Sequence, residues 1–418
     1  MNLQDTSPPL QEAPTRFRFV IYALIIAMCV VCYGDRAALS VAMPSIATEF
    51  GLTSGQTGWV LSSFLWSYFI LNLPSAILLD RLGTRVMGVL AVTLWSMAMI
   101  LGSLSASIGA FIATRVLLGI GEAPAFPLGN KVVRLWAPVR ERGAVMTAFV
   151  CGIPIGLACG AAASTWLITC FGWRTAFASL GVMGLLWAAC WLFISPRGDK
   201  ARDGKIVAVL SVPTLFRCRA FWGIVISQCC ANYANFLLMS WMPIMLRDIL
   251  HLSLAQSGTY TACANLGAAL LSLVAGKCGE YFVSGHALAR GERRRVVSLY
   301  LVLASVMGFL PFCHTTLSVV GLLAFSLAFV AAADGANMAL LADLLVDHEL
   351  LGSVTGLTMT FSNGIGILAP IMTGYLLQGT GSFHAVFYIM TTLLLLGALN
   401  ALILPRSAVH ARPVQTAP

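Results

Sequence analysis

The feature that most limits how this chain can fold is a repeat of apolar stretches, each about twenty residues long, over nearly its whole length. A helix needs about 20 mostly apolar residues to cross the hydrocarbon core of a bilayer. The sequence therefore predicts an all-α membrane protein with twelve transmembrane helices. The expected spans are 19–44, 57–79, 86–106, 109–133, 144–168, 176–195, 221–246, 256–276, 296–314, 316–341, 353–377 and 383–404.

The composition and the placement of charge agree with a lipid environment. Hydrophobic residues make up 59% of the chain and charged residues 10%, unlike soluble domains. A net charge of +9 would suit a nucleic-acid partner, but the positions of the basic residues do not. All of the 25 lysines and arginines fall in the tails and in alternate connections between the spans, except Arg36, Arg115, Arg174 and Arg247. Basic residues gather on the cytoplasmic side of membrane proteins. We therefore expect no nucleic acid, both termini in the cytoplasm, and a multi-pass protein of the bacterial inner membrane.

A polar segment divides the expected helices six and six. The predicted parts are a cytoplasmic tail (1–18), an amino-terminal half (19–195), a cytoplasmic linker (196–220), a carboxy-terminal half (221–404) and a second cytoplasmic tail (405–418). Two such halves about a midplane site are a common plan of secondary transporters. We expect a monomer whose halves rock about that site.

Apart from Lys131 at the very end of the fourth span, five charged residues fall inside the expected spans: Asp35 and Arg36 in the first, Arg115 and Glu122 in the fourth, and Asp334 in the tenth. An ion near the bilayer centre costs about 2.5–3.5 kcal/mol on insertion scales and usually marks function. Residues seven apart share one face of a helix, so Arg115 and Glu122 point the same way.

A charge count suggests what these ions do. With both acids ionised, Asp35 and Glu122 balance Arg36 and Arg115. Protonation of the acids leaves two guanidinium groups, which bind carboxylates bidentately, so proton and anion binding would be linked. The alternative, that the ions pair only to hold two helices together, stays open. Asp334 either lines the cavity from the second half or caps a local helix break.

Enzymatic chemistry finds little support in the sequence. The six histidines are scattered, and we find no metal-spaced His/Cys set, nucleophile elbow or phosphate loop. Cys29 and Cys32 have CxxC spacing, yet they lie in an apolar helix, where cysteine packs as a small hydrophobic residue. We expect no catalytic residues, no metal and no cofactor, with protons as the coupling ion.

Several motifs occur in an order typical of one family. They are Tyr33-x-Asp35-Arg36-Ala37-x-Leu39-Ser40-Val41-Ala42-x-Pro44, Arg115-x-x-x-Gly119-x-Gly121-Glu122-Ala123-Pro124-Ala125-Phe126-Pro127, Trp136-x-Pro138-x-x-Glu141-Arg142-Gly143, Phe171-Gly172-Trp173-Arg174-x-x-Phe177, Trp241-x-Pro243 and Asn363-x-x-Gly366-x-x-x-Pro370. Over 19–404 the chain resembles the anion:cation symporter family of the major facilitator superfamily. The resemblance implies the major facilitator fold and proton-driven uptake of a small organic anion, a sugar acid or related carboxylate.

The resemblance also assigns roles to residues. It implies that Asp35 and Glu122 couple protons and that Arg36 and Arg115 are cavity arginines. Tyr33, Tyr68 and Asn363 sit where relatives place polar substrate contacts, although the tyrosines also suit interfacial anchors and the asparagine a helix-to-helix bond. The resemblance further implies a gating motif in the connection after the second span, formed by Asp80, Arg81, Gly83 and Arg85.

The chain departs from the family pattern at three positions. Ala76 replaces a usual glycine, Thr84 replaces a usual basic residue, and Asp334 has no counterpart in the family's substrate site. We count Asp334 among the candidate substrate-binding residues, where it would bind a hydroxyl, an amine or a second proton. Its presence leaves the identity of the carboxylate open.

Two other functions remain as alternatives. A drug or metabolite:proton antiporter of the same superfamily would also use cavity carboxylates, but Gly152-Ile153-Pro154 lacks the antiporter pattern of adjacent glycine and proline, and arginines disfavour cationic cargo. A non-transporting membrane sensor would bind the ligand without proton-driven accumulation.

Overall fold

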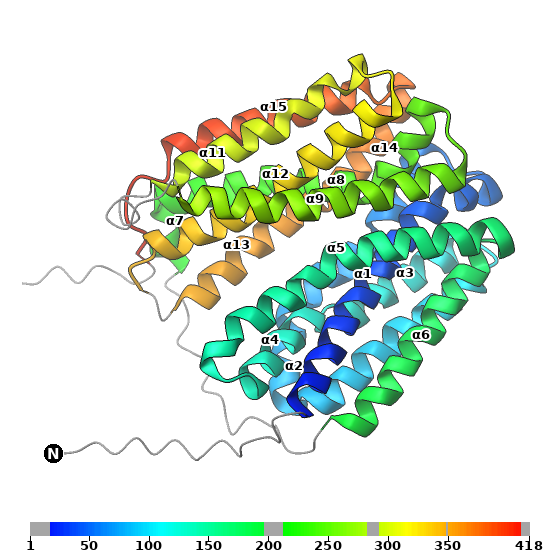
Figure 1. Ribbon diagram of the computed structural model, residues 1–418, viewed down its shortest axis with the longest axis horizontal. Coiled ribbons are helices and arrows are strands. Elements are labelled where there is room, and N and C mark those ends of the chain that lie inside the picture. Colours follow the sequence, from blue (N-terminus) through cyan, green and yellow to red (C-terminus); the bar gives the residue numbers. More distant parts are fainter. Residues whose placement is uncertain (1–16, 196–211, 282–291, 348–349, 411–418) are drawn as a thin grey trace, which may run out of the picture.

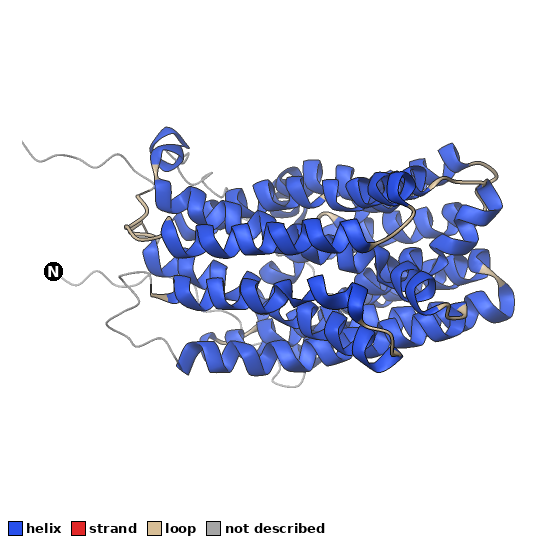
Figure 2. Ribbon diagram, turned by 90° about the horizontal axis from the view of Figure 1, so that it is seen from above, coloured by secondary structure: helices blue, strands red, loops and turns tan. Residues whose placement is uncertain are grey.

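The computed structural model describes residues 17–195, 212–281, 292–347 and 350–410. In this part of the chain nearly every residue is helical, and Figures 1 and 2 show long helices that run side by side along one direction. Residues 1–16 and 411–418 of the expected tails, and 196–211 of the expected linker, lie outside the described residues. The prediction of an all-α protein is confirmed.

The amino-terminal half contains six labelled helices. These are α1 (Phe17–Phe50), α2 (Ser54–Ser103), α3 (Ile108–Glu122), α4 (Ala125–Trp136), α5 (Val139–Phe171) and α6 (Trp173–Ile194). The short helix α7 (Val212–Arg217) then precedes the second half.

The carboxy-terminal half follows the same plan. Its helices are α8 (Arg219–Leu250), α9 (Leu254–Tyr281), α11 (Arg293–Ala304), the 3₁₀ helix η1 (Ser305–Phe312), α12 (Thr316–Leu344), α13 (Leu351–Gly366), α14 (Leu368–Thr380) and α15 (His384–Ile403). The expected spans 296–314 and 353–377 are thus each built from two consecutive helical pieces.

Within the described residues, ten segments are long and apolar enough to cross a membrane. The expected spans 57–79 and 221–246 are not among them by composition, although α2 and α8 cover both ranges. Helical structure therefore runs through all twelve expected spans, and ten of the helical segments are also apolar enough to cross a membrane.

Single residues set the breaks between these pieces. We expected a connection at 80–85, but helical structure continues from Ser54 to Ser103 and only Gly83 leaves it, with φ 81° and ψ 166°. Glycine reaches this conformation without steric cost, so one residue suffices to redirect the chain. Between α3 and α4, Pro124 lacks the N–H that a continuous helix needs. That break leaves Glu122 as the last residue of α3.

The two halves meet mainly at one end of the bundle. In Figure 1 the amino-terminal half (blue to teal) and the carboxy-terminal half (green to red) lie apart on the side where the N-terminus is drawn, and come together on the opposite side. We call these the tail end and the far end. At the far end Gln378 of α14 accepts a hydrogen bond from the Gly55 N–H of α2 at 3.1 Å, and Trp59 donates to the Tyr375 hydroxyl at 3.1 Å.

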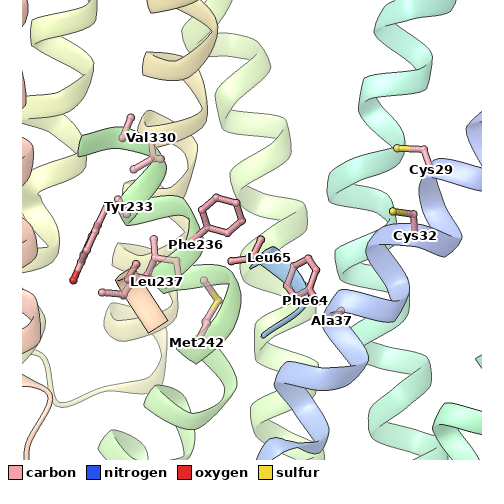
Figure 3. Close-up of a cluster of buried hydrophobic side chains, with 14 of the residues drawn as sticks. Cys29, Cys32, Ala37, Phe64, Leu65, Tyr233, Phe236, Leu237, Met242 and Val330 are labelled. Carbon is pink, nitrogen blue, oxygen red and sulfur yellow. The ribbon is translucent and has the colours of Figure 1, made fainter. Parts of the chain in front are cut away.

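Apolar side chains fill the contact between the halves nearer the middle. Figure 3 shows Phe64 and Leu65 of α2 between Ala37 of α1 and the α8 residues Phe236 and Met242. All five side chains are buried. At this depth the halves are sealed by hydrophobic packing rather than by ion pairs.

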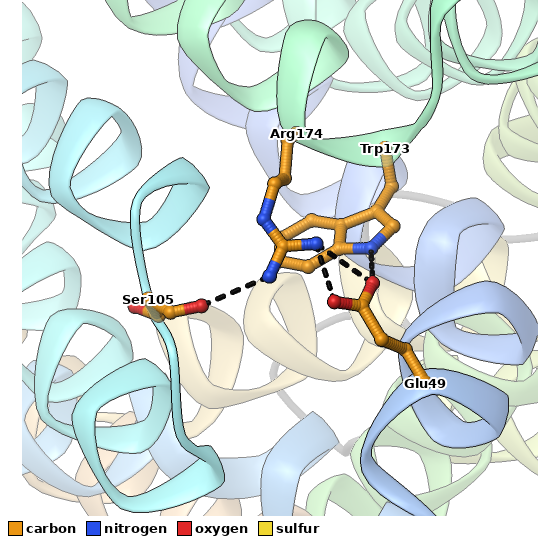
Figure 4. Close-up of polar contacts among 4 residues, drawn as sticks. All are labelled: Glu49, Ser105, Trp173 and Arg174. Carbon is orange, nitrogen blue, oxygen red and sulfur yellow. Dashed lines mark hydrogen bonds and ion pairs between the residues drawn. The ribbon is translucent and has the colours of Figure 1, made fainter.

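A polar cluster fastens the far end of the amino-terminal half (Figure 4). Glu49, near the end of α1, accepts hydrogen bonds from Arg174 at 2.5 and 2.7 Å and from the Trp173 indole at 2.7 Å. Arg174 also donates to the Ser105 carbonyl at 3.1 Å. Arg174, one of the four basic residues that fall outside the tails and alternate connections, therefore joins α1, α6 and the α2–α3 turn.

Candidate functional site

The centre of the candidate site is an ion pair between the first and third helices. Arg36 of α1 donates through Nε to Oε2 of Glu122 at 2.9 Å, and its Nη2 lies 2.8 Å from the same oxygen. The exposed fractions of the two side chains are 5% and 0%. Glu122 is the last residue of α3, two residues before Pro124.

Aromatic rings surround the guanidinium of Arg36. Its central carbon lies 4.5 Å from the ring centre of Tyr33, 4.9 Å from that of Tyr68 and 5.1 Å from that of Phe64. A cation over a ring face gains up to about 2 kcal/mol where water is excluded. Tyr33, Tyr68 and Phe64 thus form a cage that holds the positive charge of Arg36 in place.

Asp35, the neighbour of Arg36, has a different environment. It is 1% exposed, and neither carboxylate oxygen has a hydrogen-bond partner among the described residues. It interacts electrostatically with Glu122, Arg115 and Arg36. The four ions therefore share one buried cluster, in which Glu122 has a direct cationic partner and Asp35 has none.

Arg115 lies deeper inside the amino-terminal half. Its guanidinium carbon is 5.0 Å from the ring centre of Phe111 and 4.9 Å from that of Phe177, and Nη1 lies 3.3 Å from the sulfur of Met99. It is 1% exposed, and its Nε and Nη2 have no hydrogen-bond partner in the described chain. Arg115 and Arg36 therefore occupy separate aromatic surroundings.

The carboxy-terminal half holds the candidates Asp334 and Asn363 apart from this cluster. Asp334 of α12 accepts a hydrogen bond from Gln228 Nε2 of α8 at 3.0 Å. Asn363 of α13 accepts one from Asn232 Nδ2 of α8 at 2.8 Å. Asp334 and Asn363 are thus each hydrogen-bonded to an amide side chain of α8, and these two amides lie one helical turn apart.

The partners Gln228, Asn232 and Asn337 are polar residues that the sequence analysis did not single out. Asn337 donates through Nδ2 to Gln228 Oε1 at 2.8 Å and to the Ile224 carbonyl at 2.9 Å. The signal was present, because Gln228 and Asn232 are amides at i and i+4 in an apolar helix. A search for charges alone passed over them.

The gating motif surrounds the Gly83 break within α2. Asp80 forms an ion pair with Lys131 of α4 at 3.0 Å, and Arg85 donates to the Leu192 carbonyl of α6 at 2.5 Å. Gly83 forms the break in α2, and Arg81 is exposed. The contacts of Asp80 and Arg85 stay within the amino-terminal half in this conformation.

A bundle of membrane-length helices in two halves, with ions buried between helices, is the architecture of a membrane transporter. The chain belongs to the Major Facilitator Superfamily, whose family model matches residues 25–284 and 281–417.

Relatives confirm the resemblance to anion carriers. The chain is 30% identical to the chloroplastic ascorbate transporter of Arabidopsis thaliana, over 95% of this chain and 76% of that protein. It is 28% identical to a D-galactonate transporter of Escherichia coli (94% and 96%) and 26% identical to a probable galactarate/D-glucarate transporter of the same species (94% and 94%).

Solved structures support the fold. A D-xylose-proton symporter matches with a TM-score of 0.77 at 14% identity, covering 92% of this chain and 97% of that one. A bacterial homologue of the human lysosomal transporter Spinster, in an inward-facing and occupied conformation, matches with a TM-score of 0.75 at 16% identity, covering 94% and 98%. The prediction of the major facilitator fold is confirmed.

Proposed function

We propose that this protein is a proton-coupled symporter that imports a small organic anion, a sugar acid or related carboxylate, across the bacterial inner membrane by alternating access. The observation that carries the proposal is the pair of Arg36 and Glu122 inside its aromatic cage, beside Asp35, whose oxygens have no hydrogen-bond partner in the described part of the chain. Relatives named as galactonate and glucarate transporters support the class of substrate.

The ion pair suggests how proton and anion are coupled. Arg36 is already bound to Glu122. A substrate carboxylate can therefore bind the guanidinium of Arg36 only when Glu122 releases it. A proton on Glu122 removes the negative charge that holds Arg36. Proton binding then favours anion binding, and by linkage the anion favours the proton.

Asp35 and Arg115 complete the charge balance. With both acids ionised, the four residues sum to zero. A substrate anion that enters with one proton keeps that sum, so the loaded site costs no net charge in the apolar interior. In this scheme Arg36 contacts the substrate. The positive charge of Arg115, which is enclosed by Phe111 and Phe177, balances the negative charge of Asp35.

The conformation supports alternating access. The halves are closed at the far end by the bonds between Gly55 and Gln378 and between Trp59 and Tyr375. With both termini in the cytoplasm, the far end faces the outside, and the tail end is the side from which substrate leaves. We propose that one chain, in contact with lipid and without a partner subunit, carries out the cycle with protons as its coupling ion.

The test is uptake of labelled D-galactonate into proteoliposomes under an imposed pH gradient, acid outside. The wild type accumulates the substrate. Glu122→Gln and Asp35→Asn lose accumulation, while Glu122→Gln, which resembles the protonated acid, retains exchange of substrate across the membrane. Asp343→Asn is the matched control, because Asp343 pairs with Arg293 at the tail end of α12. Gradient-driven accumulation by both Glu122→Gln and Asp35→Asn would refute the scheme.

A further inference from the structure

The carboxy-terminal half contains a chain of side-chain hydrogen bonds whose direction is fixed by the backbone. The Ile224 carbonyl can only accept, so the Asn337 amide turns its Nδ2 toward it, at 2.9 Å. The same Nδ2 donates to Gln228 Oε1 at 2.8 Å. Gln228 therefore presents its Nε2 to Asp334, at 3.0 Å.

This direction gives Asp334 the role of acceptor at the end of the chain. An ionised carboxylate is an acceptor only, whereas a protonated one also needs an acceptor of its own. Asn337 and Gln228 are buried at 2% and 1%, so water does not reorient them freely. The arrangement suits a negative charge at Asp334.

The depth of these groups relative to Arg36 follows from one contact. The helices α1 and α8 run in the same direction and touch where the Ser40 hydroxyl donates to the Ser240 carbonyl at 2.6 Å. At a rise of about 1.5 Å per residue, Arg36 lies about 6 Å to the tail side of this contact, Asn232 about 12 Å and Gln228 about 18 Å. The axial offset from Arg36 to Asn232 is therefore comparable with the length of an extended six-carbon chain.

A second contact brings α13 close to α2 near the aromatic cage. A side-chain carbon at Gly364 of α13 would lie 3.6 Å from the ring of Phe69 on α2. Gly364 follows Asn363, which bonds Asn232, and Phe69 follows Tyr68 of the cage. This contact brings the part of α13 that carries Asn363 next to the part of α2 that carries Tyr68.

The charges on the two sides differ in sign. The amino-terminal side offers Arg36, whereas the arginines and lysines of the carboxy-terminal half within the described residues lie at helix ends. They are Arg217, Arg219, Arg247, Lys277, Arg293, Arg294, Arg295 and Arg406. The interior of the second half therefore supplies an acid and amides. Both can bind hydroxyl groups, and the acid repels a second carboxylate.

We propose that Asp334, held by Gln228, selects for substrates with one carboxylate and a neutral hydroxylated tail, and excludes dicarboxylates of the same length. The inference rests on the proposed function, because it assumes that Arg36 takes the carboxylate. The hydroxylated tail reaches Asn232, and Asp334, held by Gln228, lies one helical turn of α8 beyond it. A second carboxylate in that position meets a like charge.

The experiment compares D-galactonate, a six-carbon acid with one carboxylate, with D-glucarate, which has two. Uptake of each labelled acid is measured in proteoliposomes for the wild type, Asp334→Asn, Asp334→Glu and Asp343→Asn. We expect the wild type to favour galactonate, and Asp334→Asn to raise the glucarate to galactonate ratio of kcat/KM by about tenfold or more. Asp334→Glu keeps the charge and the wild-type ratio, and Asp343→Asn keeps the ratio because Asp343 is paired at the tail end.

The outcomes separate this inference from the proposed function. If the wild type carries galactonate but Asp334→Asn leaves the ratio unchanged, the role of Asp334 is wrong and the symport stands. If the wild type already prefers glucarate, the inference is wrong in the same way. If it carries neither acid nor any other carboxylate, the proposed function fails and the inference with it.

Discussion

Arg36 and Glu122 form the ion pair that joins α1 to α3 inside the amino-terminal half, with two guanidinium nitrogens directed at one carboxylate oxygen at 2.9 and 2.8 Å. Neither side chain reaches solvent, because their exposed fractions are 5% and 0%. Removing one partner leaves the other as an uncompensated charge in an apolar interior. The pair is therefore a stability determinant as well as a candidate coupling element.

A double-mutant cycle measures this coupling. We expect Glu122→Leu or Arg36→Met alone to lower the free energy of unfolding by about 3–5 kcal/mol. The double variant should lose less than the sum of the two, with a coupling energy of about 2 kcal/mol or more. Unfolding in mixed micelles, followed by circular dichroism, provides the free energies.

The control cycle uses Asp80→Leu and Lys131→Met. This pair also joins a carboxylate to a basic side chain, at 3.0 Å, but Asp80 is 64% exposed, and exposed ion pairs contribute about 0–1 kcal/mol. Equal coupling energies in the two cycles would contradict the role of burial.

Arg36→Lys tests whether the cage requires a planar cation. Lysine keeps the charge but loses the forked donors and the flat face that lies over Tyr33 and Tyr68. We expect KM for galactonate to rise by about tenfold or more, since one bidentate contact is replaced by a point charge. Uptake kinetics in proteoliposomes measure it. Arg247→Lys, an exposed arginine at the far end, should leave KM unchanged, and an unchanged KM in Arg36→Lys would argue against direct contact with substrate.

The helices were predictable from the sequence because each span must be apolar over its whole length. A break within an expected span was not, since a single residue suffices: Pro124 separates α3 from α4 inside the span expected at 109–133, whereas Gly83 falls in the connection expected at 80–85. Propensity and hydropathy average over many residues. A change of direction at one residue is lost in that average.

The candidate site shows a similar division. Intramembrane charge drew attention to Asp35, Arg36, Arg115 and Glu122, since ions are rare in such helices. Which arginine pairs with which acid depends on how α1 packs against α3, and a helical repeat cannot supply it. Neutral amides such as Gln228 carry a weaker signal, although their hydrogen bonds fix the orientation of Asp334.

The cluster at the far end of the amino-terminal half should contribute to stability without affecting transport selectivity. Glu49 bonds Trp173 and Arg174, but the side chains of Glu49 and Arg174 are 41% and 42% exposed. We expect Glu49→Gln to lower the free energy of unfolding by about 1 kcal/mol, and less at high salt, because exposed charges are screened. Unfolding measured at two ionic strengths tests this. A loss of several kcal/mol in the free energy of unfolding that is the same at both ionic strengths would be inconsistent with screening.

Closure of the far end depends on the lack of a side chain at Gly58. A β-carbon there would meet the carbonyl oxygen of Pro370 on α14 and lie 3.1 Å from the Cα of Ile371. Backbone atoms cannot move aside as a flexible side chain can, so Gly58→Leu must push α14 away from α2. Because this contact exists only when the halves meet at the far end, the substitution should favour the conformation that is open there.

Spin labels at Thr48 and Ser253 detect that shift, because the two residues come from different halves and both line a far-end pocket of about 520 Å³. In a background without cysteines, we expect Gly58→Leu to lengthen the distance between the labels and to slow gradient-driven uptake, since the carrier must close at this end in every cycle. The control is Gly321→Leu on α12, where an added β-carbon meets open space. If Gly58→Leu and Gly321→Leu give the same distances as the wild type, then the contact between Gly58 and Pro370 does not decide which end of the protein is closed.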